Sequence, residues 1–442
     1  MTELLSAVDK YRQLILDTER YIWSNPETGY KEYKTSKYLE EQFEKLGYEV
    51  VKAQGVTGFY TVIDTGFDGP EILVLGELDS VICPSHKDAY SRTGAVHACG
   101  HNAQCAALLG IAAVLKEPDA LKSMCGRIKL CAVPAEELIE IEYRSRLISE
   151  GKIKYYCGKT EFLHRGYFDS CDIAFMMHIS DVYSVTDGSV GSIAKRIIYK
   201  GVSSHAGGSP WNGKNALYAA SCGINAVNAV RETFKEKDMI RFHPIITRGG
   251  DTVNAIPEQA TLESYVRGSS YDAIIKANKN INRALIGAAL SVGTNIEIID
   301  IPGYAPLCND KNMIELCKKA AKIAVPQEKL HYEPVITSGS TDMGDLSLLM
   351  PIVHPYVAGS KGNYHGSDYQ ICDVTSACIN NAKWQLAMIY MLLCNNATKA
   401  KEIISQYKPL FASKKEYLKF IDSINDSGDR IIYKEEKADI RL

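Results

Sequence analysis

The sequence has no apolar run that approaches the roughly 20 residues required by a membrane-spanning helix. Residues 1–5 lack the basic segment followed by an apolar stretch that marks a secretion signal. A basic excess is also missing, because 50 Lys and Arg are set against 53 Asp and Glu. Without such an excess, binding to nucleic acid or to an anionic membrane is not expected. These absences predict a cytoplasmic protein whose partner is a small molecule.

A regular cysteine framework is absent too. The thirteen cysteines are odd in number and have no repeating spacing, and several, such as Cys105, Cys131 and Cys222, stand within apolar runs. This usage is typical of reduced core thiols in a reducing compartment. Hydrophobic residues make up 46% of the chain and charged residues 23%, the balance of a globular protein. At 442 residues the chain is too long for one ordinary core, which predicts two or three domains.

Cys99 and His101 stand two positions apart, directly before the apolar run 103–111. We expect a loop to give way to a buried helix here, with Gly100 letting the backbone bend so that sulfur and imidazole face one point. Thiolate and imidazole are ligands of transition metals, and the helix N-terminus favours the thiolate. Taken alone, the pair is equally compatible with a buried structural cysteine and an ordinary hydrogen-bonded histidine.

Three apolar runs that we predict as strands each lead into a residue able to bind a metal. They are residues 71–76 with Asp79, residues 128–133 with Glu136 and Glu137, and residues 172–177 with His178. Open α/β sheets bind ligands at the carboxyl ends of their strands. Two adjacent glutamates repel each other unless a cation or a proton separates them. A solvated acidic helix start, continued by Glu140 and Glu142, is the alternative interpretation of that pair.

A different pattern begins near Ser192. Strands and helices alternate there as β–α–β–β–α–β, with strands expected at 193–199, 240–247, 260–267 and 295–301 and helices at 215–232 and 271–290. This order is that of a ferredoxin-like unit. We therefore predict an α/β protein with a mixed sheet covered by helices on both faces and an inserted ferredoxin-like α+β domain. The catalytic domain would comprise 1–190 and 303–442, the insertion 191–302, and the Lys-rich tail from residue 395 surface helices.

Eight short motifs, spread over roughly residues 20 to 370, give the chain a family resemblance. They are residues 76–79, 98–102, 134–137, 177–178, 204–206, 249–257, 266–268 and 339–345. In content and order they resemble the di-metal aminoacylase and carboxypeptidase G-like metallopeptidase superfamily. Within it, the match is to the amidohydrolase branch of aminobenzoyl-glutamate hydrolases, indole-acetyl-amino acid hydrolases and β-alanyl-lysine-type dipeptidases.

The resemblance implies a site with two divalent cations, Zn or Mn. It gives the metal ligands as Cys99, which bridges the two ions, and His101, Glu137, His178 and His365. Glu136 would be the general base that takes a proton from the attacking water and returns it to the leaving amine. Asp79 would orient a ligand without binding the metal itself.

Three further roles follow from the same resemblance. His205 on the inserted domain would stabilise the oxyanion, Arg267 would bind a substrate carboxylate through its planar fork, and Asn254 would contact the substrate. Without the resemblance, His205 could equally be an exposed loop histidine, and Asn254 could equally be a residue that forms a turn. The relatives also imply a homodimer and a lid role for the insertion. The chain departs from the pattern in the long loop 84–96, which could change substrate choice.

We therefore predict a metallo-amidohydrolase that cleaves the amide bond of an N-acyl or aminoacyl amino acid with a free carboxylate. Two other classes stay open. One is a metal-free cysteine hydrolase that uses Cys99 with His101, although residues two positions apart rarely align as nucleophile and base. The other is a non-catalytic small-molecule-binding homologue, for which a retained Glu136 would have no purpose.

Overall fold

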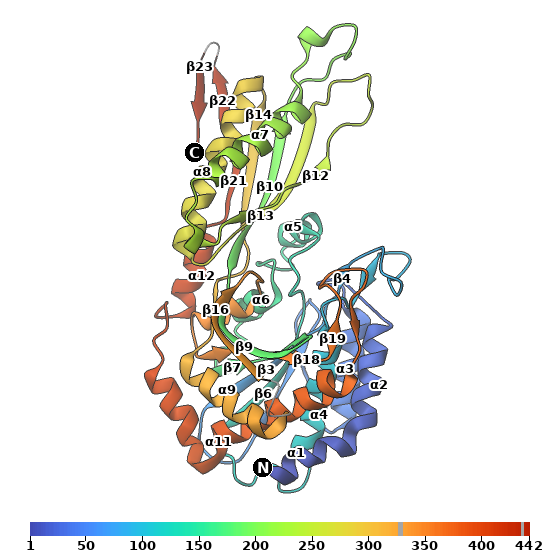
Figure 1. Cartoon of the computed structure of the whole chain (residues 1–442), viewed down its shortest axis with the longest axis vertical. Coiled ribbons are helices and arrows are strands. Elements are labelled where there is room, and N and C mark those ends of the chain that lie inside the picture. The colour runs from blue at the N-terminus through green and yellow to red at the C-terminus, as the bar shows by residue number, and fades with distance from the viewer. Residues whose placement is uncertain (326–329, 435–436) are drawn as a thin grey trace. The chain divides into compact units, whose positions relative to one another are not determined.

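The computed structural model describes residues 1–325, 330–434 and 437–442. The chain divides into two compact units, each assembled from separate segments of the sequence. Unit 1 comprises Met1–Gly188, Leu307–Ile336 and Thr341–Lys414, and unit 2 comprises Ser189–Pro306, Thr337–Ser340 and Lys415–Leu442. Figure 1 shows both units along the chain.

A six-stranded mixed sheet forms the centre of unit 1. Its order is β1 (Val51–Lys52), β2 (Phe59–Asp64), β6 (Arg127–Val133), β3 (Glu71–Glu77), β7 (Ile173–Phe175) and β17 (Ile352–Val353). From β6 to β17 neighbouring strands are parallel, whereas β1 and β2 are antiparallel. All seven residues of β3 are buried, as expected for a continuous apolar run in a strand covered on both faces.

Helix α4 (His101–Leu115) is the most deeply buried helix of unit 1, because its side chains are apolar on every face. It packs against β3, α2 (Arg12–Trp23) and α11 (Asn381–Gln406). Gly110 allows the close approach of α2, since a Cβ there would stand 2.6 Å from the side chain of Ile15. The other helices of unit 1 are α1 (Thr2–Ala7), η1 (Val8–Tyr11), α3 (Tyr33–Lys45), α5 (Ile141–Ser149), α6 (Gly158–His164), α9 (Lys311–Ala324), α10 (Met343–Ser347) and η5 (Thr375–Asn380).

A second sheet of unit 1 begins at His178. It contains β8 (His178–Ser180), β9 (Tyr183–Ser189), β15 (Leu307–Cys308), β16 (Leu330–Thr337) and β18 (Tyr356–Ala358). His178 therefore opens a strand of this sheet and does not end the predicted strand 172–177, which stops at Phe175. Two short antiparallel sheets of two strands each are also present. One pairs β4 (Val81–Ile82) with β5 (Ala95–Val96), and the other pairs β19 (Ser360–Lys361) with β20 (Gln370–Ile371).

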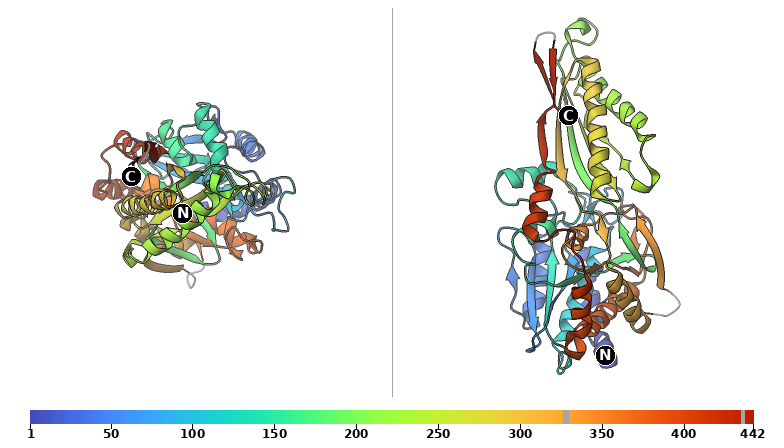
Figure 2. Two further views of the ribbon diagram at one scale, coloured as in Figure 1. Left: turned by 90° about the horizontal axis from the view of Figure 1, so that it is seen from above. Right: turned by 90° about the vertical axis from the view of Figure 1, so that its left-hand side faces the viewer.

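Unit 2 is built on an antiparallel sheet with two helices on one face (Figure 2). Its order is β11 (Arg241–Phe242), β13 (Gln259–Gly268), β10 (Gly191–Lys200), β14 (Asn295–Pro302) and β21 (Asp426–Asp429), with β12 (Ile245–Arg248) beside β13. The helices are α7 (Ala216–Arg231) and α8 (Tyr271–Val292). Both begin at capping side chains, since Asn215 accepts from the N–H of Tyr218 and Ser270 from that of Ala273.

The predicted helical tail is wrong after Asp422. Helices α11 and α12 (Lys414–Asp422) are followed by β21 and by the hairpin of β22 (Ile431–Lys434) and β23 (Lys437–Ile440). β21 pairs with β14 and extends the unit 2 sheet. The mixed charge of this tail conceals the β-branched side chains of Ile431 and Ile440, which pair across the hairpin. No helix within the described residues combines the length and apolarity needed to cross a membrane.

A buried ion pair links the sheet of unit 2 to α8. Nζ of Lys195 on β10 contacts Asp300 on β14 and donates to the side-chain oxygens of Asn278 at 2.9 Å and Asn282 at 2.6 Å. The Lys195 side chain is fully buried, and burial lowers its pKa despite the attraction of Asp300. Removing one partner would leave an uncompensated charge in the core.

We predict that Lys195→Met destabilises the protein by about 3–5 kcal/mol, because the Asp300 carboxylate would remain buried without its cation. Lys200→Met is the matched control on the same strand, where the ion pairs with Glu297 and Asp429 are partly exposed. Its expected effect is about 1 kcal/mol or less. Urea unfolding monitored by circular dichroism measures both. Equal, small effects would contradict the importance of the buried pair.

Candidate active site

The site of unit 1 is centred on the N-terminus of α4. Gly100 precedes the helix with φ of 82°, a left-handed conformation, and a Cβ at this position would stand 2.6 Å from the hydroxyl of Tyr369. His101 is the first residue of α4 and is fully buried, and Cys99 is 6% exposed. The expected change from loop to buried helix therefore falls between these two side chains.

Cys99, His101 and His178 form one candidate metal-binding group, because one ligand atom of each lies within 4.8 Å of the others. Sγ of Cys99 is 3.3 Å from Nε2 of His178. The other ring nitrogen of His178, Nδ1, donates to the carbonyl oxygen of Ile179 at 2.9 Å, so Nε2 is left to face the sulfur.

Cys99, Glu137 and His365 form a second group within the same limit. Nε2 of His365 lies 2.9 Å from Oε1 of Glu137. The backbone of His365 has φ of 59°, which is uncommon for a residue with a Cβ, and its N–H donates to the carbonyl oxygen of Ala98 at 2.9 Å. Cys99 thus belongs to both groups, which is the arrangement required of a bridging ligand.

Asp79 contacts two other predicted site residues. Its carbonyl oxygen lies 2.9 Å and its Oδ1 3.3 Å from Nδ1 of His101, while its Oδ2 accepts from the backbone N–H of Glu137 at 2.9 Å. The side chain is fully buried. These contacts orient the His101 ring.

Glu77, Lys159 and Asp342 are site residues that the sequence motifs did not assign. Oε2 of Glu77 is 3.1 Å from Nε2 of His101, and Oε1 of Glu77 is 2.5 Å from Nζ of Lys159. Lys159 also contacts the carboxylate of Asp342, and all three side chains are buried. Glu77 ends a buried strand and Asp342 lies in the motif 339–345, so both have a signal in the sequence, whereas Lys159 comes from a distant segment without one.

Burial disfavours the thiolate of Cys99, and the charge of Glu137 adds to this effect. The neighbouring His178 and His101 outweigh both and lower the pKa of the Cys99 thiol to about 6. Burial likewise raises the pKa of Glu137, but the charge of His365 reverses this and lowers it to about 2. Glu137 in turn raises the pKa of His365 to about 11. The lowered pKa values of Cys99 and Glu137 favour the thiolate and the carboxylate, which are the forms that bind cations.

Glu136 points away from Glu137, although the two are adjacent in sequence. Its carboxylate lies in a third group, with Glu77 and His101. The turn before it contains Ala135 with φ of 56°, a left-handed conformation that is uncommon for a residue with a Cβ. Burial and the charges of Glu77, Glu137 and Asp342 raise the pKa of Glu136 well above its usual value. The two glutamates are therefore placed for different tasks.

The donors fit a pair of divalent cations. Nε2 of His101 and Oε1 of Glu137 are buried, and neither makes a hydrogen bond of normal geometry within the described part of the chain. Buried polar atoms are otherwise almost always satisfied. Thiolate, imidazole and carboxylate together suit Zn, Mn and other transition metals. Cys99, His101, Glu137, His178 and His365 are thus available to hold two ions.

The three remaining predicted residues lie in unit 2. His205 is exposed, and its Nδ1 accepts from the N–H groups of Gly207 at 3.1 Å and Gly208 at 2.8 Å, which leaves the proton of the neutral ring on Nε2. The carbonyl oxygen of exposed Asn254 accepts from the N–H next to His205, at Ala206. Arg267 on β13 is half-buried and donates to the hydroxyl of Ser340 at 3.0 Å. Its neighbour Ser340 belongs to the Gly-Ser-Thr-Asp loop.

A mixed α/β unit with two candidate metal-binding groups that share Cys99 has the donor set of a metal-dependent hydrolase. The comparison with family models identifies the group more closely. The model of peptidase family M20/M25/M40 matches residues 73–388, so the chain belongs to this family. The predicted superfamily is therefore confirmed, and with it the class of hydrolase acting on amide bonds.

Characterised relatives have several substrates. The chain is 28% identical to Xaa-Arg dipeptidase of Mus musculus over 410 residues, which cover 91% of this chain and 88% of the relative. It is 25% identical to one of the chains of p-aminobenzoyl-glutamate hydrolase of Escherichia coli over 298 residues, covering 66% and 58%. It is 26% identical to N-acetyl-L-cysteine deacetylase of Bacillus subtilis over 338 residues, covering 72% and 73%.

Solved structures show the same fold. A putative aminohydrolase from methicillin-resistant Staphylococcus aureus superposes with a TM-score of 0.70 and 21% identity, covering 89% of this chain and 99% of the other. A dinuclear metal-binding peptidase of the M20 family from Bacillus subtilis gives a TM-score of 0.64 and 19% identity, covering 87% and 99%. Family members thus include enzymes that bind two metals.

We predict that His178→Ala weakens Zn²⁺ or Mn²⁺ binding by more than about 100-fold, beyond the 10–100-fold typical of groups that only support a ligand. Titration of the metal-free protein by calorimetry, with elemental analysis of the metal content, measures this. His164→Ala is the matched control, because His164 is exposed on α6 and belongs to none of the three groups. Equal affinities of the two variants would exclude His178 as a ligand.

Proposed function

We propose that the protein hydrolyses the amide bond of an N-acyl or aminoacyl amino acid that carries a free carboxylate. The divergence of Glu136 and Glu137 carries this proposal. Glu137 faces His365 and Cys99, whereas Glu136 faces Glu77 and His101. A carboxylate for the metals and a second one for proton transfer are what metal-assisted hydrolysis requires. The named relatives, a dipeptidase, an acyl-glutamate hydrolase and a deacetylase, support the substrate class.

Cys99, His101, Glu137, His178 and His365 would hold two divalent cations, Zn or Mn. When bound, such ions lower the pKa of a water and polarise the carbonyl under attack. Asp79 keeps the His101 ring in place through Nδ1 and holds the Glu137 backbone through its N–H. The protein thereby prepares the ligand positions before the substrate arrives, which reduces reorganisation during the reaction.

Glu136 would act as the general base and then as the general acid. It takes a proton from the attacking water, and it returns this proton to the leaving amine nitrogen. Its raised pKa depends on burial and on nearby carboxylates. Cations bound at the proposed site would neutralise part of the charge of those carboxylates and so lower the pKa of Glu136 toward the operating pH. A group whose pKa lies near the operating pH can both accept and return a proton.

Residues of unit 2 would complete the substrate site. Because Nδ1 of His205 is occupied by two N–H groups, its Nε2–H can donate to the oxyanion. Arg267 would bind the substrate carboxylate through its guanidinium, and Asn254 would add a polar contact. This assignment makes unit 2 a lid and dimerisation domain and unit 1 the catalytic domain, with the tail 415–442 belonging to unit 2 and not to the predicted catalytic part 303–442. We propose a homodimer on the same basis.

All thirteen cysteines are free in the structure. Unpaired thiols are typical of a reducing compartment, so we propose the cytoplasm as the site of action. The donor set accepts several transition metals, and availability in the cell would decide between Zn and Mn.

Glu136→Gln should lower kcat by about 10²–10⁴, the usual contribution of a positioned general base. The metal content should stay unchanged, because Glu137 and not Glu136 faces the bridging cysteine. A panel of N-acyl amino acids and dipeptides, assayed with the metal-loaded enzyme, measures the rates. Glu142→Gln is the control, since Glu142 is exposed on the nearby helix α5. Full activity of the Glu136 variant would refute the proposed role.

Metal removal distinguishes this metal-dependent mechanism from that of a metal-free cysteine hydrolase. We expect EDTA to abolish hydrolysis and added Zn²⁺ or Mn²⁺ to restore it. The metal-loaded protein should also be more stable to unfolding, by about 2.7 kcal/mol at a hundredfold excess of metal over Kd. Thermal denaturation with and without chelator measures this. Activity that survives EDTA but is lost on alkylation would instead indicate a cysteine hydrolase based on Cys99, whose low pKa and contact with His178 are compatible with such chemistry.

A further inference from the structure

An open cleft of unit 1 shares no lining residue with the candidate active site. It lies between α3, α5 and the segment that joins β1 to β2, and its volume is about 710 Å³. Pockets for small organic ligands span about 300–1,000 Å³. Neither the metal groups nor the proposed substrate contacts make use of this cleft.

The side chains of the cleft carry an excess of positive charge. Four cations, Lys37, Lys52, Arg146 and Lys152, stand against two carboxylates, Glu40 and Glu150. Each carboxylate pairs with one lysine at 2.8 Å, Glu40 with Lys52 and Glu150 with Lys152. Lys37 and Arg146 are the two cations in excess of the lining carboxylates, although Lys37 faces Glu41 at 3.9 Å and the charge of Arg146 acts on Glu150. The cleft therefore favours an anion.

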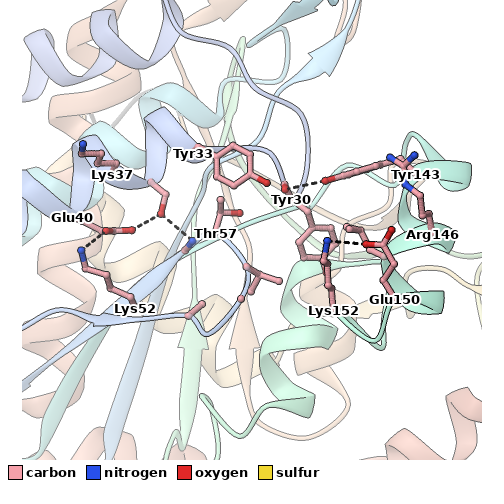
Figure 3. A pocket seen from close by; sticks show the side chains of 16 residues that line it. Tyr30, Tyr33, Lys37, Glu40, Lys52, Thr57, Tyr143, Arg146, Glu150 and Lys152 are labelled. Carbon is pink, nitrogen blue, oxygen red and sulfur yellow. Dashed lines mark hydrogen bonds and ion pairs between the residues drawn. The ribbon is translucent and has the colours of Figure 1, made fainter.

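Tyrosine rings form the middle of the cleft (Figure 3). In this view Tyr30 and Tyr33 separate Lys37 and Lys52 from Arg146. Tyr33 is 66% exposed, whereas Tyr30 is only 3% exposed, and Arg146 lies 5.4 Å from the ring centroid of Tyr143. Exposed aromatic faces next to a guanidinium bind flat rings that carry a carboxylate.

We propose that this cleft binds a small organic anion with a flat ring, whose ring stacks on Tyr33 and whose carboxylate is held by Arg146. The ligand would be an effector of the enzyme, because the cleft wall is packed against the turn of the two glutamates. Tyr30 and Leu147 share a hydrophobic cluster with Ala135, the residue before Glu136. Binding would stabilise the strained backbone of Ala135 in the conformation seen here.

Polar contacts strengthen the same connection. Glu32 accepts from the hydroxyl of Thr57, a lining residue, at 2.6 Å and from the N–H of Ala135 at 2.8 Å. Arg144 lies over the ring of Tyr30 and donates to the carbonyl oxygens of Ala135 and Glu137. The effector and the cations of the proposed active site should therefore bind cooperatively. This cooperativity rests on the proposed metal function, whereas anion binding in the cleft does not.

Indole-3-acetate is a suitable probe, with indole-3-ethanol lacking the charge and acetate lacking the ring. We expect saturable binding of indole-3-acetate to the metal-free full-length protein by calorimetry, and about tenfold weaker binding of either partial probe. Arg146→Met should weaken binding about tenfold, and Arg146→Lys less. Lys45→Met removes the same charge from an exposed position of α3 outside the cleft and should have no effect. Equal binding by the wild type and Arg146→Met would overturn the proposal.

Cooperativity is measured by titrating Zn²⁺ with and without the probe. We expect Zn²⁺ affinity to rise about fivefold or more, with an equal rise of probe affinity in the presence of Zn²⁺, because linkage is reciprocal. Arg146→Met should remove this coupling. Coupling that persists in that variant would show that the carboxylate acts at the metals and would refute the effector role. If the protein binds no Zn²⁺ at all, the proposed metal-dependent function is refuted. Binding of indole-3-acetate would still test whether the cleft binds an anion.

Discussion

The contacts of Asp79 hold together the two loops on which the candidate site depends. One oxygen faces the His101 ring and the other accepts from the backbone of Glu137, so a single buried carboxylate fixes one ligand by its side chain and another by its main chain. This link spans parallel neighbours β3 and β6, whose carboxyl ends lie at the same edge of the sheet. The positions of His101 and Glu137 therefore depend on the relative position of these two strand ends.

Charge balance is the second constraint. Carboxylates of Glu77, Asp79, Glu136 and Glu137 and the thiol of Cys99 are all buried near one another. Lys159 offsets part of this charge through Glu77, and protonated histidines offset more. Burying several like charges is unfavourable unless cations or protons compensate them. An apo protein would achieve this with protons, and metal binding would release them.

The carboxylates that follow the ends of β3 and β6 were predictable from the sequence. So was the set of thiol, imidazole and carboxylate donors around Cys99. Apolar runs likewise identified β3, β6 and α4, and the alternation of strands and helices identified the elements of unit 2 within residues 191–302. Three features could not be foreseen. The pair of Lys159 and Asp342 depends on contacts between distant segments, the left-handed backbone of His365 has no local signature, and strands of the tail are hidden by its mixed charge.

The return of the chain to unit 2 at Lys415, the second residue of α12, determines how that unit can be separated from the rest. β21 covers the outer edge of β14, and the side chain of Ile431 is buried in the core of the same unit. A fragment cut at residues 191 and 302 would expose the N–H and C=O groups of β14 along its length, and open edges of this kind pair with other molecules. Isolating the unit in soluble form therefore calls for grafting residues 415–442 onto the fragment, for example through a short flexible linker after Pro302.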